Sequence, residues 1–196
     1  MTSENDPQVV FKGTTAELLA VQSGQSLEEY RAERDFKDAL NAESTQYVDL
    51  PAFKWPNLKF VWDFSTASQR FALDGVSQSE FVSSYPDGFV HAWVRLDEFD
   101  AHLCHQSKRE TEDELWGLGS KSKLAFLIAY LRCGHPITPP LVALTVNNEF
   151  VFQGGNHRYA VAKAIGAHSL PVYMQRHTYS RAAEIVTLMD ADTPSP

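Results

Sequence analysis

The sequence predicts an α/β (α+β) fold in which helices pack on a mixed sheet. Residues 149–154 form a short apolar strand pattern that runs through two glycines into an amphipathic helical pattern. Upstream, Leu124, Leu127, Ile128 and Leu131 recur at helical spacing and predict a helix starting near residue 120. A chain of 196 residues, 43% of them hydrophobic, is also long enough to bury a core.

An N-terminal extension over residues 1–88 is expected to be acidic, partly helical and packed on a main domain at residues 89–188. Residues 1–13 and the tail at 189–196 are expected to be disordered. Thr14 or Thr15 is placed to cap a short helix through Val21. Ser26, followed three residues later by Glu29, forms a capping box that predicts a helix extending toward Leu40.

Residues 46–88 are rich in aromatic side chains, and residues 58–64 alternate well enough to predict a strand. Lys54, Lys59 and Arg70 lie among these aromatics, a mixture that can stack the bases of a single nucleic-acid strand. Because the surroundings are acidic, we favour packing of the aromatics in a core.

The net charge of −8 is unevenly distributed. Residues 1–118 hold 10 Lys and Arg against 21 Asp and Glu, a balance of −11, whereas residues 119–196 hold 7 against 4, a balance of +3. The second part therefore suits nucleotide binding better than extensive DNA contact. Two cysteines and the lack of a long apolar run or signal-peptide pattern favour a cytoplasmic protein without a membrane partner.

The segment Gly154-Gly155-Asn156-His157-Arg158 joins the predicted strand to the predicted helix. Free N–H groups and the dipole at a helix start favour an anion, and glycines allow its close approach. His157 and Arg158 add hydrogen-bonding or positive side chains at the same place. This pattern predicts a phosphate-binding turn, although a plain tight turn followed by a solvated helix start has the same sequence pattern.

Residues 89–188 resemble the ParB/sulfiredoxin superfamily (the ParB-like nuclease domain). The resemblance rests on the Gly-Gly-Asn-His-Arg-Tyr turn, the opening segment 91–99, the helix at 121–131, the loop at 134–142 that contains Pro139-Pro140, and the helix stop and following strand at 166–173. It implies ATP or another nucleotide as ligand, contacted by Gly154, Gly155, Asn156, His157, Arg158 and Lys123.

Three positions depart from the sulfiredoxin pattern. Asn156 stands where sulfiredoxin has its nucleophilic cysteine, which excludes sulfinic-acid reduction because an amide cannot replace a thiolate. Phe126 and Tyr130 replace a serine and a threonine of the nucleotide pocket. ParB proper has Gly-Glu-Arg-Arg at the turn and further DNA-reading parts, so the resemblance is closer to stand-alone members, including plasmid fertility-inhibition (Osa-like) proteins.

Phosphate chemistry needs a base or a metal-binding carboxylate near the anion. The resemblance places the end of the first strand beside the turn, which makes Glu98, Asp97 and Asp100 candidates, with Glu98 favoured. His157 is a candidate acid, and Mg²⁺ a candidate cofactor of cleavage. His91, His102, Cys104 and His105 lack the spacing of zinc ligands, so no metal site of the protein's own is predicted.

The favoured hypothesis is therefore an ATP-hydrolysing, metal-dependent DNase, with a role in plasmid fertility inhibition. The alternatives are a non-catalytic, nucleotide-dependent binding module for a protein or DNA complex, with the N-terminal extension as a docking arm, and a small-molecule kinase of the same fold.

Overall fold

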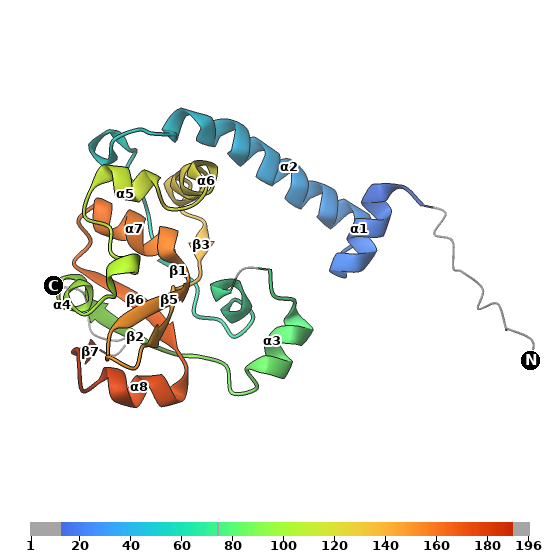
Figure 1. Cartoon of the computed structure of the whole chain (residues 1–196). Helices are drawn as coiled ribbons and strands as arrows, with labels where there is room; N and C mark the ends of the chain where they lie inside the picture. The colour runs from blue at the N-terminus through green and yellow to red at the C-terminus, as the bar shows by residue number, and fades with distance from the viewer. Residues whose placement is uncertain (1–12, 74, 190–196) are drawn as a thin grey trace, which may run out of the picture. The chain divides into compact units, whose positions relative to one another are not determined.

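A computed structural model describes residues 13–73 and 75–189 of the chain (Figure 1). The predicted disorder of residues 1–12 and 190–196 lies outside the described residues. The chain divides into two compact units, residues 1–43 and residues 44–196. Each unit is described by itself below.

The described part of the first unit contains two helices, α1 (Thr15–Ser23) and α2 (Leu27–Ser44), and α2 extends one residue into the second unit. The Thr14 hydroxyl accepts from the backbone N–H of the glutamate three residues later, and the carboxylate of that glutamate accepts from the Thr14 N–H. Ser26 makes the same reciprocal pair at the start of α2. Both predicted helix starts are thus confirmed, and α2 continues beyond Leu40.

The second unit is built on a five-stranded mixed sheet with the order β5-β4-β6-β2-β7. Its strands are β2 (Val90–Arg95), β4 (Leu141–Leu144), β5 (Phe150–Gly154), β6 (Ser169–Met174) and β7 (Leu188–Met189). Only the β4–β6 pair is parallel; β4–β5, β2–β6 and β2–β7 are antiparallel. The predicted fold class, α/β with a mixed sheet, is confirmed.

Helices cover both faces of this sheet. The helices that follow β2 are α4 (Leu96–Ala101), α5 (Glu112–Trp116), α6 (Lys121–Arg132), α7 (Asn156–Ala164) and α8 (Arg176–Ala182). In Figure 1, α6 and α7 lie above the strands and α8 lies below them. The central strand β6 is accordingly buried at every position from Leu170 to Met174, as expected for a strand covered on both faces. None of the described helices combines the length and apolar character needed to span a membrane.

Residues 44–88 belong to the same compact unit as the sheet. They form short elements: η1 (Thr45–Tyr47), η2 (Ala52–Lys54), β1 (Val61–Trp62), η3 (Gln69–Ala72) and α3 (Gln78–Ser84). The strand is shorter than the pattern at residues 58–64 predicts. It pairs in parallel with β3 (Pro136–Ile137), which precedes the Pro-Pro loop, and so attaches this early segment to the later half of the unit.

The aromatic residues of this segment have two different environments. Phe81 is 3% exposed and packs edge-on against Phe89, which in turn contacts Tyr173 of the central strand. For Phe81 the predicted core packing is therefore confirmed. Phe53, in contrast, is 82% exposed and Phe71 is 53% exposed, so for these two the same prediction is wrong.

Candidate functional site

The glycine turn is formed as the sequence predicts: β5 ends at Gly154, Gly155 caps α7 with φ of 86°, and Asn156 begins the helix. Backbone from two other segments packs directly on it. A Cβ added to Gly154 would lie 1.9 Å from the Ala72 carbonyl oxygen, and one added to Gly155 would lie 2.7 Å from Cα of Pro140. Both positions therefore need glycine, Gly155 for its φ as well as for the close approach.

Arg158 joins two other backbone segments, residues 138–139 and residue 71, to the start of α7 next to this turn. One terminal nitrogen of its guanidinium donates to the carbonyls of Thr138 and Pro139 at 2.8 and 3.0 Å, and the other donates to the carbonyl of Phe71 at 2.8 Å. The planar fork of five N–H donors suits such multiple contacts. The residue predicted to bind phosphate thus also has a structural task, which sequence patterns do not show.

His157 and Asn156 occupy the first turn of α7. His157 Nε2 lies 2.8 Å from the carbonyl oxygen of Leu118. Because a carbonyl only accepts, Nε2 carries the proton in this contact. The Asn156 side-chain oxygen is buried and has no hydrogen-bond partner among the described residues. His157 therefore links α7 to the segment before α6, whereas the side-chain oxygen of Asn156 is buried.

A pocket of about 460 Å³ opens beside Arg158 and is called the Arg158 pocket below. Among the described residues, its lining includes three aromatic residues, one cation, one carboxylate and two buried hydroxyl residues: Phe71, Phe126, Tyr130, Arg158, Asp63, Ser68 and Thr138. The rings of Phe126 and Tyr130 lie nearly parallel, with centroids 6.2 Å apart and an interplanar angle of 23°. The volume is within the range of about 300–1,000 Å³ typical of small-molecule sites.

Lys123 lies on α6, one helical turn before Phe126 and Leu127, which both line the pocket. Residues three and four apart share one face of a helix. The exposed Lys123 side chain is therefore on the pocket side of α6 without being part of the pocket wall. Arg158 therefore lines the Arg158 pocket directly, whereas Lys123 lies on the same side of α6 but outside the lining.

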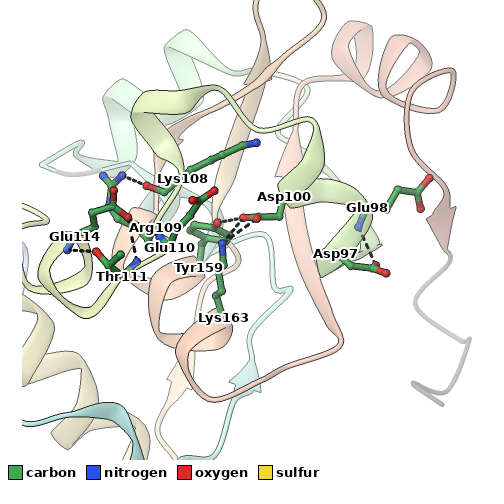
Figure 2. A network of polar contacts seen from close by, with 10 residues as sticks. All are labelled: Asp97, Glu98, Asp100, Lys108, Arg109, Glu110, Thr111, Glu114, Tyr159 and Lys163. Atoms are coloured by element: carbon green, nitrogen blue, oxygen red, sulfur yellow. Dashed lines mark hydrogen bonds and ion pairs between the residues drawn. The ribbon is translucent and has the colours of Figure 1, made fainter.

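The predicted catalytic carboxylates have partners of their own. Asp97 makes an ion pair with Arg95 at 2.6 Å, and this contact, followed by the Glu98 backbone N–H, holds the pKa of Asp97 below its usual value. The Glu98 carboxylate accepts from the backbone N–H of Thr187 at 3.0 Å. Figure 2 shows both carboxylates pointing away from the group formed by Tyr159 and Lys163 of α7.

Asp100 is the carboxylate of α4 that contacts α7. It accepts from Lys163 Nζ at 2.8 Å and from the Tyr159 hydroxyl, as Figure 2 shows. Burial, followed by the hydrogen bond to Asp100, raises the pKa of Tyr159. The three candidate acids therefore lie in three separate environments, and Asp100 is joined to α7 through its side chain.

Asp63 is the carboxylate in the Arg158 pocket, and sequence reasoning missed it. It directly follows β1, and its backbone N–H donates to the Ile137 carbonyl at 2.9 Å. The only signal in the sequence is a single acid between Trp62 and Phe64 within an otherwise apolar and basic strand pattern. A charged residue there is compatible with solvent exposure, so the pattern alone does not indicate a pocket.

The remaining candidate ligands for a metal are dispersed. The His91 ring packs on Phe64, with centroids 4.7 Å apart, and the Cys104 thiol donates to Ser107 at 3.2 Å. Within residues 13–73 and 75–189, no three side chains of His, Cys, Asp or Glu are grouped so that they could hold a metal ion. The described residues therefore offer no ligand set for Mg²⁺ supplied by the protein alone.

Comparisons with protein-family models, with curated proteins and with solved structures find no match to this chain. The ParB/sulfiredoxin resemblance accordingly remains a hypothesis that rests on the quoted residues.

Proposed function

We propose that this chain is a nucleotide-binding protein and that the Arg158 pocket is its binding site. The observation that carries the proposal is the composition of one pocket: flat aromatic walls from Phe126 and Tyr130, and the Arg158 guanidinium from the glycine turn. Aromatic rings stack on a base, and a guanidinium binds phosphate oxygens. Lys123 on the same side of α6 supplies a second cation for a longer phosphate chain.

Binding is favoured over hydrolysis by the contacts of the acids. Asp97 and Glu98, the predicted candidates for activating a water molecule, are engaged by Arg95 and Thr187. The carboxylate of the pocket, Asp63, is itself held by the Ser65 backbone N–H. ATP hydrolysis, Mg²⁺-dependent DNA cleavage and kinase activity all require an acid that is placed at the phosphate. We therefore favour the non-catalytic module, in which nucleotide binding controls contact with a protein or DNA complex, including one that acts in plasmid fertility inhibition.

The test measures nucleotide binding by calorimetry in wild type, Phe126→Leu and Phe53→Leu. Phe126→Leu keeps apolar volume but removes the stacking ring, and Phe53 is an exposed phenylalanine outside the pocket. Wild type and Phe53→Leu are expected to bind at least one of ATP, GTP, CTP and UTP. Phe126→Leu should bind about tenfold more weakly, in line with the contribution of a stacked base.

Two results would contradict the proposal: no binding of any of the four nucleotides at millimolar concentration, or equal affinities in the three proteins. Thermal melts show whether Phe126→Leu is folded. Phosphate release and plasmid nicking, measured in the same samples with Mg²⁺, distinguish the non-catalytic binding module from the phosphohydrolase. Nucleotide binding without release or nicking is the expected outcome, and turnover would reinstate the phosphohydrolase.

A further inference from the structure

Asp63 is fixed in the wall of the Arg158 pocket by its own loop. Its side-chain oxygen Oδ1 accepts from the Ser65 backbone N–H at 2.8 Å, and its carbonyl accepts from the Ser68 hydroxyl at 2.9 Å. The first of these contacts is the hydrogen bond of an Asx turn, which orients the carboxylate. An ionised carboxylate has about four acceptor positions, so an Asx turn leaves it able to accept from a ligand.

The carboxylate is negatively charged at neutral pH. Hydrogen bonds from the side chain and the backbone of Ser65 hold the pKa of Asp63 below its usual value. Asp63 and Tyr130 line the same pocket, and the charge of Asp63 contributes, after burial, to the raised pKa of Tyr130. The half-buried acid is thus an acceptor-only group beside the surface on which a base would stack.

The pocket therefore has two chemically different parts. Arg158, which also contacts Phe71 and Thr138, is a donor group that suits phosphate. Asp63, near Tyr130, is an acceptor group that repels phosphate and attracts N–H donors. A ligand that satisfies both parts has an anion at one end and a flat ring with N–H donors at the other.

Among the common bases, guanine fits this acceptor best. Its Watson–Crick edge presents two adjacent donors, N1–H and the N2 amino group, which together match the two oxygens of a carboxylate. Adenine presents an unprotonated N1 beside its amino group, and a carboxylate repels that lone pair. An acceptor that is removed from water and meets no donor is costly, so the mismatch discriminates strongly.

We infer that the Arg158 pocket is selective for guanine nucleotides, with Asp63 accepting both donors of the base edge while Arg158 faces the phosphate. The inference rests on the proposed nucleotide binding. It makes Asp63 a specificity-determining residue contributed by the segment before the ParB/sulfiredoxin-like region.

The experiment compares wild type, Asp63→Asn and Asp87→Asn, using GTP, ITP, ATP and XTP as probes in equilibrium binding. Asparagine keeps the Oδ1 acceptor of the Asx turn, so the loop is retained, and Asp87 is an exposed acid outside the pocket. Wild type and Asp87→Asn should bind GTP at least about tenfold more tightly than ATP. ITP, which lacks the N2 amino group, should be intermediate.

Asp63→Asn should lose the preference for GTP and gain affinity for XTP, because the amide N–H matches the C2 oxygen of xanthine. A purely structural role of Asp63 would not produce that exchange of ligands. Equal affinity of wild type for GTP and ATP, or unchanged selectivity in Asp63→Asn, overturns the guanine inference while leaving the nucleotide site in place. Failure of every nucleotide to bind overturns the proposed function as well.

Discussion

Arg158 and Tyr159 are adjacent residues of α7, but their side chains lie in two regions that are stabilised by different kinds of contact. On the Arg158 side, a guanidinium donates to three backbone carbonyls of two segments and lines a pocket. On the Tyr159 side, Asp100 joins the tyrosine hydroxyl to Lys163, and the ion pair is only 22% and 28% exposed. In the first region, a side chain holds backbone segments around the Arg158 pocket. In the second region, contacts between side chains join α4 to α7.

The two regions are expected to be sensitive to different kinds of substitution. The carbonyl contacts of Arg158 depend on where the backbone lies, so side-chain changes at Thr138 or Phe71 leave the acceptors in place. The Asp100 group depends on the side chains themselves, because removal of one partner leaves a partly buried charge without compensation. The comparison therefore predicts backbone sensitivity on the first side and side-chain sensitivity on the second.

The largest effect is expected from Gly155→Ala, compared with Gly166→Ala. Both glycines have positive φ, 86° and 76°, but an added Cβ meets Pro140 at Gly155 and meets nothing within 4 Å at Gly166. The shared φ strain cancels in the comparison, and the steric clash adds about 1–3 kcal/mol of destabilisation at Gly155. Urea unfolding measures the loss of stability in both variants. Equal losses would show that the Pro139-Pro140 loop shifts to accommodate the added Cβ without a cost in stability.

A smaller loss of stability is expected from Asp100→Ala. It leaves Lys163 without its ion pair and Tyr159 without its acceptor, which costs about 2 kcal/mol for groups that are mostly buried. Asp97→Ala is the matched control, since its ion pair with Arg95 is solvent-exposed and its removal should cost far less. If the two variants unfold at the same urea concentration, the side-chain group does not fasten α7.

The smallest effect appears only at alkaline pH. The pKa of Tyr159 is raised in the folded protein above its ordinary value of about 10. Above pH 10 the unfolded chain loses this proton while the folded chain keeps it, so stability that is present at neutral pH declines as the pH rises. Tyr159→Phe should therefore lose less stability than wild type between pH 9 and about pH 11; parallel declines in urea titrations would refute the assignment.

The same two regions show which structural features can be predicted from the sequence. The helix starts at Thr14 and Ser26 and the turn into α7 are local patterns, and they form as predicted. Asp100 was recognised as a candidate acid, but its contact with Lys163 depends on tertiary packing of residues distant in sequence. The carbonyl partners of Arg158 carry no signature at all, because every residue has a carbonyl.

Asp63 was missed for a related reason. Residues 58–64 predict a strand, but only Val61–Trp62 forms one, because β3 has just two residues and its parallel register covers only Val61 and Trp62. The acid then falls at the end of the strand and in the pocket rather than within a continuous strand. Strand length was decided by a distant partner, which a local pattern cannot contain.

The parallel pairing of β1 with β3 has a consequence for the order in which the protein assembles. Val61 meets Pro136, about 75 positions later in the chain, and the pocket also needs Arg158. Contacts between residues that lie so far apart in the sequence form slowly, because the intervening chain loses entropy when they meet. During synthesis, the segment that bears Asp63 leaves the ribosome long before Pro136 and Arg158, so the pocket cannot form, and cannot bind a ligand, until those residues have emerged.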